Sequence, residues 1–299
     1  MPVLALRRAA RSWLPLLALA AAAAARGAPL QVVTLSTVLT EIATAVGGDA
    51  VSVTALVRPG VDPHTFEPAP QDLRAMAEAD LVLGAGLGLE PYLDRLTANA
   101  GARGRIAEVG DALAGSTLYV GGSGRREADP HWWNSVFATM TITRRVAVEL
   151  TALRPADGPE FAAHAQAYLA QLGALERWTR AQVDLIPPDR RLLVTTHDAF
   201  GWFARDYGFT IRSISGISPE AEPNARDLAR LVDWIRQRHI PAIFVENSAN
   251  RRLVAAVVEE TGVRLGGELY PDGLTPDADG ATYAGMVRHN VLTLVAALR

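Results

Sequence analysis

The stretch PEFAAHAQAYLAQLGALERWTRAQVDLI, from Pro159 to Ile186, decides how the chain is organised. It holds no β-rich run and no proline after its first position, and alanine and leucine dominate its interior. Asp157 can cap a helix here, Pro159 suits a first helical turn, and Pro187 stops the helix. At about 1.5 Å per residue this helix would be roughly 40 Å long. That length favours a strut connecting two lobes over an ordinary core helix of one domain.

The segments on either side of this helix share one pattern, in which short β-rich runs alternate with stretches of helical periodicity. Strand, helix and strand in succession favour a parallel sheet covered by helices. We therefore predict an α/β fold of two lobes, each a mostly parallel sheet flanked by helices, joined by one long rigid helix. The β-rich runs are Val32 to Leu35, Val51 to Val57, Asp80 to Gly84, Leu192 to Thr196, Phe209 to Ile214 and Ala242 to Glu246. The predicted parts are a signal peptide at 1–28, an N-terminal lobe at 29–156, a linker helix at 157–188 and a C-terminal lobe at 189–299.

Composition limits the classes of function. The 299 residues include 49% hydrophobic and 20% charged residues, which is typical of a folded globular protein. The formal net charge is -3, and no long run of lysine and arginine occurs. Nucleic-acid binding depends largely on neutralising phosphates, so we expect no nucleic acid as a partner.

The first residues have the pattern of a secretory signal. Three arginines give a positive start, an apolar run extends from Trp13 to Ala25, and small residues around Ala28 offer a cleavage site. The apolar run is shorter than the ~20 residues that a membrane-spanning helix needs. The chain has no cysteine, hence no disulfide and no thiol for a lipid anchor. We expect a cleaved, unanchored protein in the periplasm.

Two histidines are presented by the same tripeptide. His64 lies in RPGVDPHTFEP, just after a predicted strand, and His131 lies in ADPHWW, ahead of a helical stretch. The proline before each imidazole restricts the backbone of the preceding aspartate. A stiff approach of this kind suits a ligand that must be held in place.

Two further candidate ligands lie in the second half. His197 ends the strand LLVTT and opens the helix DAFGWFARDYG, at the carboxyl edge where ligands of α/β sheets gather. Asp272 lies in ELYPDGLT, where the flanking proline and glycine mark a turn. Each residue alone fits a surface or turn role, but two from each half favour a shared site in the cleft between lobes. Three imidazoles and one carboxylate are a plausible ligand set for zinc.

The other histidines, His164, His239 and His289, fall within the long helix, in a polar turn and within the last helix. We assign them surface or packing roles. The sequence leaves open whether Glu246 or Asp198 orients a ligand histidine, as carboxylates beside metal sites commonly do.

Two enzymatic interpretations fit less well. Gly84, Gly86 and Gly88 follow a strand and precede a helix expected at Glu90, as in a dinucleotide loop, but Leu89 stands where the third glycine is required. The pair formed by His197 and the next aspartate resembles part of a hydrolytic triad, yet the chain has no GxSxG nucleophile elbow.

The motifs together resemble the solute-binding proteins of zinc and manganese ABC importers, the metal-binding cluster A-I family. The matching stretches are PGVDPHTFEPAPQDLRAMAEADLVLGAGLGLEPYLDRL, DPHWW, LLVTTHDAFGWFARDYGF, PAIFVEN and GGELYPDGL with ATYAGMVRHNV behind it, in order from about Val32 to the C-terminus. The resemblance implies two α/β lobes on one rigid helix with small hinge closure, a monomer, and an ABC importer membrane permease as partner. It implies the ligands His64, His131, His197 and Asp272.

The same resemblance bears on the metal. Manganese members tend to have glutamate as the third ligand, whereas this chain has His197, and three nitrogen donors favour Zn²⁺. Many zinc members carry a loop rich in histidine before the second ligand. Here the corresponding stretch from Leu118 to Asp129 reads LYVGGSGRREAD and contains no histidine. We expect one Zn²⁺ as the transported ion, with Mn²⁺ or Fe²⁺ as alternatives. A zinc hydrolase would need an open coordination position, for which four protein ligands leave little room, so we expect a binding protein and no enzyme.

Overall fold

The computed structural model describes residues 27–120, 126–218, 225–247 and 251–299. The predicted signal peptide, apart from its last two positions, lies outside these residues. Among the described residues, no helix is both long and apolar enough to cross a membrane.

The N-terminal lobe is built on a four-stranded parallel sheet in the order β2-β1-β3-β4. Side chains of β1 alternate between two apolar layers, because successive residues of a strand point to opposite faces. Val32 packs with Ile42 of α2, while Val33 on the other face packs with Met76 of α3. The elements are β1 (Leu30–Thr34), α2 (Thr37–Gly47), β2 (Val51–Ala55), α3 (Pro70–Glu78), β3 (Leu81–Gly84), α4 (Leu93–Ala100) and β4 (Arg105–Glu108).

The C-terminal lobe has two parallel strand pairs, β7 with β8 and β9 with β10, and β7 lies beside β9. Its elements are β7 (Leu192–Thr195), α7 (Gly201–Tyr207), β8 (Thr210–Ser213), α8 (Ala225–Arg238), β9 (Ala242–Glu246), α9 (Arg251–Thr261), β10 (Arg264–Leu269) and α10 (Tyr283–Leu298). The predicted strands are confirmed with small shifts at their ends, and the predicted two-lobed α/β class is confirmed.

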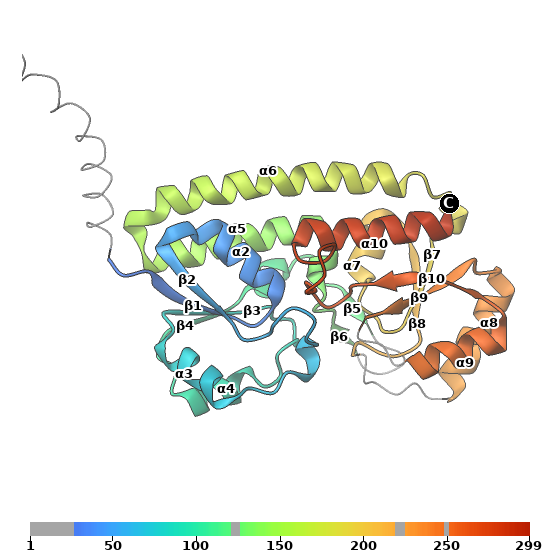
Figure 1. Cartoon of the computed structure of the whole chain (residues 1–299), viewed down its shortest axis with the longest axis horizontal. Helices are drawn as coiled ribbons and strands as arrows, with labels where there is room; N and C mark the ends of the chain where they lie inside the picture. The colour runs from blue at the N-terminus through green and yellow to red at the C-terminus, as the bar shows by residue number, and fades with distance from the viewer. Residues whose placement is uncertain (1–26, 121–125, 219–224, 248–250) are drawn as a thin grey trace, which may run out of the picture.

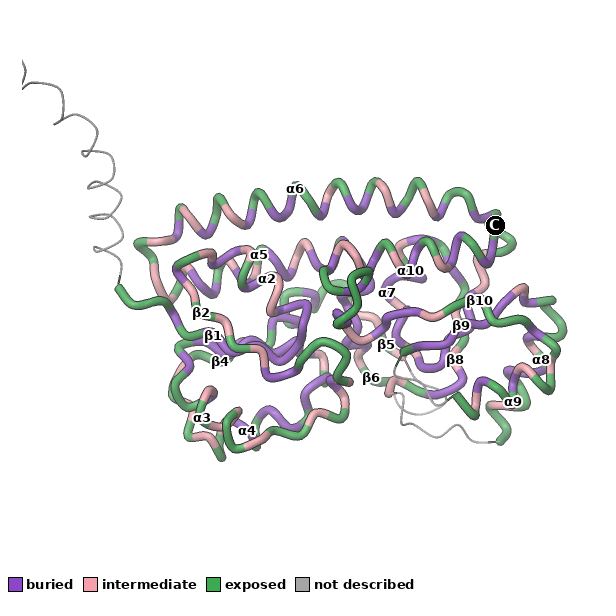
Figure 2. The backbone as a smooth tube through the Cα atoms, in the orientation of Figure 1, coloured by how far each residue is buried: buried purple, intermediate pink, exposed green. Residues whose placement is uncertain are grey.

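A long helix, α6 (Gly158–Val183), runs beside both lobes (Figure 1). It packs against α2 and α10 and against α5 (Val136–Leu153), and its buried positions face these helices (Figure 2). The predicted connecting helix is therefore confirmed. Its N-terminus differs from the prediction, since within the described residues the Asp157 side chain makes no capping hydrogen bond. Asp157 Oδ2 instead accepts a hydrogen bond from Arg154 Nη1 at 3.5 Å.

Two further kinds of element occur among the described residues. Two short strands, β5 (Tyr119–Val120) and β6 (Glu127–Ala128), pair antiparallel. Short 3₁₀ helices connect the larger elements: η1 (Gly48–Ala50), η2 (Pro63–Thr65), η3 (Val109–Leu113), η4 (Trp132–Asn134), η5 (Pro155–Asp157) and η6 (Pro188–Arg190).

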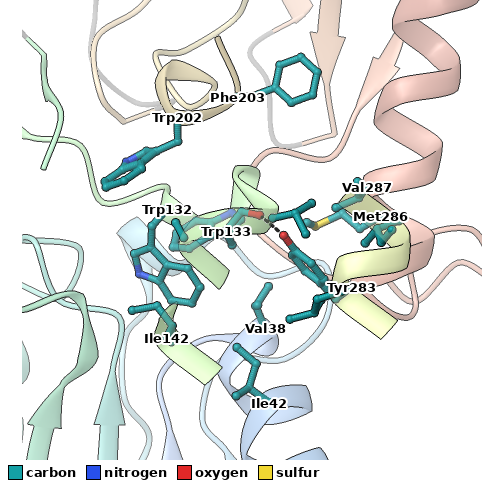
Figure 3. Close-up of a cluster of buried hydrophobic side chains, with 14 of the residues drawn as sticks. Val38, Ile42, Trp132, Trp133, Ile142, Trp202, Phe203, Tyr283, Met286 and Val287 are labelled. Carbon is teal, nitrogen blue, oxygen red and sulfur yellow. Dashed lines mark hydrogen bonds between the residues drawn. The ribbon is translucent and has the colours of Figure 1, made fainter. Parts of the chain in front are cut away.

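One apolar core continues from lobe to lobe. Trp133, Trp202 and Tyr283 are fully buried in it, although they come from η4, α7 and α10 (Figure 3). The Tyr283 hydroxyl donates to the Trp133 carbonyl at 2.8 Å and accepts from Thr139 Oγ1 at 2.9 Å. Close packing of this kind transmits strain rather than absorbing it, so the lobes resist independent movement. The division into lobes at 29–156 and 189–299 stays a prediction.

Candidate metal centre

The structure brings the four predicted ligand residues together. One donor atom from each of His64, His131, His197 and Asp272 lies within 4.8 Å of all the others. They come from four loops: η2 after β2, the residues before η4, the loop after β7 and the loop after β10. The four side chains therefore meet where loops from both predicted lobes come together.

The donor atoms are spaced as a small ion requires. His64 Nε2 lies 3.0 Å from His131 Nε2, and Asp272 Oδ1 lies 3.7 Å from His64 Nε2. The same Oδ1 lies 3.8 Å from His131 Nε2 and 3.2 Å from His197 Nε2. Zinc bonds of ~2.0 to 2.1 Å in a tetrahedron place neighbouring ligand atoms about 3.3 to 3.4 Å apart. Three imidazole nitrogens and one carboxylate oxygen thus surround a space of the size that zinc fits.

Both DPH tripeptides make the same hydrogen bond from the histidine amide to the aspartate side chain. Asp62 Oδ1 accepts a hydrogen bond from the His64 amide at 2.8 Å, and Asp129 Oδ1 accepts one from the His131 amide at 2.9 Å. The intervening proline has no N–H that could compete for the carboxylate. The aspartate, and not only the proline, therefore fixes the backbone of each histidine.

Two buried carboxylates hold the imidazole rings. Asp129 Oδ1 lies 2.9 Å from His131 Nδ1, and Glu246 Oε2 lies 2.5 Å from His197 Nδ1. When Nδ1 carries the proton and donates it to the carboxylate, Nε2 is left to face a metal ion. Glu246 is therefore the carboxylate that orients His197, while the amide of Asp198 donates to Gly216 O. No motif in the sequence indicates the ring contact made by Asp129.

The site is closed on one side and open on the other. His131 and His197 are completely buried, whereas the side chains of His64 and Asp272 are 9% and 8% exposed. His64 also lines an open pocket together with Phe66, Tyr92 and Arg95. His64 thus forms the edge of the site nearest to solvent.

Burial and neighbouring charges set the protonation of the candidate ligands. Burial lowers the pKa of His131 well below its usual value, and the charges of His197 and His64 lower it further. Burial also lowers the pKa of His197, but the charges of Asp272 and Glu246 outweigh this and raise that pKa well above its usual value. For Asp272, burial opposes ionisation, yet His197 and His64 hold the carboxyl pKa well below its usual value. Without metal, a charged His197–Asp272 pair therefore occupies the centre.

The remaining histidines lie outside this cluster. His164 Nδ1 lies 3.2 Å from Val46 O on α2, and the His289 ring stacks on Tyr270 with centroids 4.0 Å apart. His239 follows α8 with a φ of 50°, in the turn before β9. These positions agree with the predicted packing and surface roles.

The glycine-rich loop after β3 is closed by its own carboxylate. The amides of Ala85 and Gly86 donate to Glu90 Oε1 and Oε2 at 2.7 and 3.0 Å. A bound phosphate would need such amides, so this contact argues against the dinucleotide interpretation. The helix expected at Glu90 begins at Leu93, because Glu90 turns back to the loop.

The helix expected to open at His197 also begins later, at Gly201. Residues from His197 to Phe200 form a loop in which the Ala199 amide donates to His197 O at 3.1 Å. His197 is consequently a loop residue, like His131 and Asp272.

Comparison with known proteins gives consistent matches. The family model described as "Zinc-uptake complex component A periplasmic" matches residues 32–297. The zinc-binding protein TroA of Treponema pallidum is 36% identical over 92% of this chain and 91% of its own length. The manganese-binding lipoprotein MntA of Bacillus subtilis is 34% identical over 90% of each chain. The solved structure of the periplasmic TroA superposes with a TM-score of 0.83 at 34% identity, over 91% of this chain and 99% of that chain.

Proposed function

This chain belongs to the family of periplasmic zinc-uptake components, and we propose that it captures one divalent metal ion and delivers it to the membrane permease of an ABC importer. The observation that supports this most is the convergence of His64, His131, His197 and Asp272 within 4.8 Å. The ion is cargo, held by four protein atoms until the permease receives it. We propose the periplasm as the place of capture and one chain with one ion as the working unit.

Zinc is the ion we propose. Imidazole nitrogen suits zinc better than it suits manganese, which prefers oxygen ligands, and three of the four donor atoms here are nitrogen. Separations of 3.0 to 3.8 Å between donor atoms also agree with a tetrahedral zinc site. TroA is named a zinc-binding protein, but MntA is named a manganese-binding one, so manganese is the alternative to be tested.

A binding role also agrees better than catalysis with this set of ligands. Catalytic zinc sites typically have three protein ligands and a fourth position for water or substrate. Here four protein side chains converge, and two of them, His131 and His197, are completely buried. The relatives are substrate-binding proteins of importers, and we propose the same class for this chain.

The deciding experiment is elemental analysis of the protein purified from its native compartment, followed by competition between zinc and manganese for the demetallated protein. The proposal expects about one zinc per chain and tighter binding of zinc. If the purified protein contains manganese and binds manganese more tightly than zinc, manganese is the transported ion instead. Cleavage of esters, peptides or phosphates by the zinc-loaded protein would contradict the binding role.

A further inference from the structure

Asn134 is a buried amide that contacts the loops of two metal ligands at once. Its Nδ2 donates to the carbonyl of Ala199 at 3.0 Å and to the carbonyl of Pro271 at 3.0 Å. The residue is 6% exposed. A primary amide has two N–H donors, and both are used here. Pro271 directly precedes the ligand Asp272.

Backbone bonds connect Asn134 and Ala199 to the two remaining buried ligands. The backbone N–H of Asn134 donates to His131 O at 3.1 Å, and the backbone N–H of Ala199 donates to His197 O at 3.1 Å. The side chain of Asn134 therefore bonds to the segments of His197 and Asp272, and its backbone bonds to the segment of His131. His131 belongs to the predicted N-terminal lobe and the other two belong to the C-terminal lobe.

Trp133 strengthens one arm of this arrangement. Its Nε1 donates to the Pro271 carbonyl at 2.6 Å, so that carbonyl accepts two hydrogen bonds from adjacent residues. The Trp133 ring also lies against the His131 ring, with centroids 5.5 Å apart. Hydrogen bonds in a buried setting are electrostatically stronger than those in water, and they restrict the groups that make them.

We propose that Asn134 is a positioning residue that fixes the spacing of His131, His197 and Asp272 before the ion arrives, and thereby favours zinc over manganese. This inference rests on the proposed metal-binding function. A ligand set held at tetrahedral spacing needs no ordering when zinc binds, so less affinity is lost. Manganese takes more ligands than four, most of them oxygen, and gains less from that spacing.

The test variant is Asn134→Leu, which keeps a similar size and removes both donors. Its matched control is Asn290→Leu. Asn290 is 4% exposed, and its side chain accepts from the Tyr270 amide at 2.8 Å and donates to the Tyr270 carbonyl at 2.9 Å. These two bonds go to a single residue, Tyr270, whereas the Asn134 side chain connects the segments of two proposed ligands. Both variants lose a buried amide and are expected to unfold at a lower temperature.

The readouts are zinc and manganese affinities from chelator competition and the absorption spectrum of the cobalt-loaded protein. In Asn134→Leu, zinc affinity should fall roughly 10- to 100-fold, as is typical when partners of metal ligands are removed. Manganese affinity should fall less, and the intense visible bands of tetrahedral cobalt should weaken. In Asn290→Leu, the zinc-to-manganese ratio and the cobalt bands should stay close to those of the unchanged protein.

Should Asn134→Leu fail to fold, Asn134→Ser offers one shorter donor and is expected to give a change in the same direction. A folded Asn134 variant with an unchanged zinc-to-manganese ratio and unchanged cobalt bands would overturn the inference. So would equal losses of zinc affinity in the Asn134 and Asn290 variants. The proposed function fails separately, if the unchanged protein binds neither zinc nor manganese.

Discussion

His197 Nδ1 lies 2.5 Å from Glu246 Oε2, and both side chains are buried at the junction of β7 and β9. The same carboxylate accepts hydrogen bonds from the amides of His197 and Thr196 at 3.2 to 3.3 Å. Glu246 therefore holds both the backbone and the ring of His197. It directs Nε2 of that ring towards Asp272 Oδ1, 3.2 Å away.

Replacing Glu246 by glutamine should consequently weaken zinc binding. Glutamine has a single acceptor oxygen and carries no charge, so it cannot hold the ring and both amides as the carboxylate does. We expect a loss of roughly 10- to 100-fold in zinc affinity, measured by chelator competition. Asp198→Asn is the matched control, because it also replaces a carboxylate by an amide, at the residue directly after His197. An equal or larger loss in the Asp198 variant would contradict this assignment.

The four proposed ligands should be separable from the other histidines by single substitutions to alanine. Loss of a direct ligand should cost more than the roughly 10- to 100-fold typical of an outer partner. His164→Ala, His239→Ala and His289→Ala should leave zinc affinity nearly unchanged, because these residues lie outside the cluster. If one of these three variants lost zinc while a variant of the cluster retained it, the site would be misassigned. The four variants of the cluster are His64→Ala, His131→Ala, His197→Ala and Asp272→Ala.

Zinc should also stabilise the folded protein. The ion would bind loops from both lobes, and these loops lie close together only in the folded protein. At a free zinc concentration of a hundred times the dissociation constant, mass action alone contributes ~2.7 kcal/mol to the free energy of unfolding. For a chain of this size that corresponds to a rise of roughly 5 °C in the melting temperature. The demetallated protein should show this rise when zinc is added, whereas the His197→Ala variant should not. An unchanged melting temperature of the unsubstituted protein would count against the site.

The proposed ligands could be selected from the sequence because each lies in a short motif with its own local cause, and the structure brings the four side chains together. The DPH tripeptides are an example, since Asp62 and Asp129 act on the histidine two residues later. The residues that support the ligands were harder to predict, because their contacts depend on how distant segments meet. Asp198 is adjacent to His197 in sequence, yet Glu246, 49 residues away, makes the contact. That choice follows from β7 lying beside β9, which no local pattern specifies.

Asn134 and Glu90 were missed for a related reason. The Asn134 amide acts on the backbone carbonyls of Ala199 and Pro271, 65 and 137 residues away, and any residue type can offer a carbonyl. Glu90 turns back to the amides of Ala85 and Gly86, so the helix starts at Leu93 although the local pattern allowed an earlier start. Local periodicity indicates where a helix can form but does not include such competing hydrogen bonds.

In the metal-free protein, the charges around His197 and His131 set the protonation of these two imidazoles. Burial disfavours the charged imidazolium of His197, but Asp272 and Glu246 on its two sides raise the pKa of His197 well above its usual value. Burial and the neighbouring histidine charges hold the pKa of His131 well below its usual value. At pH 7 the metal-free protein therefore carries a proton on His197 that zinc must displace, and no such proton on His131. For folding, the proton on His197 stabilises the metal-free protein fully below its unfolded pKa of ~6.5, and this contribution is lost as pH rises through the folded pKa.

Zinc binding at pH 7 should accordingly release about one proton from His197, and zinc affinity should rise about tenfold per pH unit until the pH passes the pKa of that imidazole. Calorimetry in buffers of different ionisation enthalpy measures the released proton, and chelator competition between pH 6 and 9 measures the slope. Glu246→Gln removes one of the two charges that raise the pKa of His197, so this variant should release less proton at pH 7 and reach its plateau of affinity at lower pH. Zinc binding without proton release at pH 7, together with an affinity independent of pH from 6 to 9, would show that His197 is neutral in the metal-free protein and that Asp272 and Glu246 do not hold its proton.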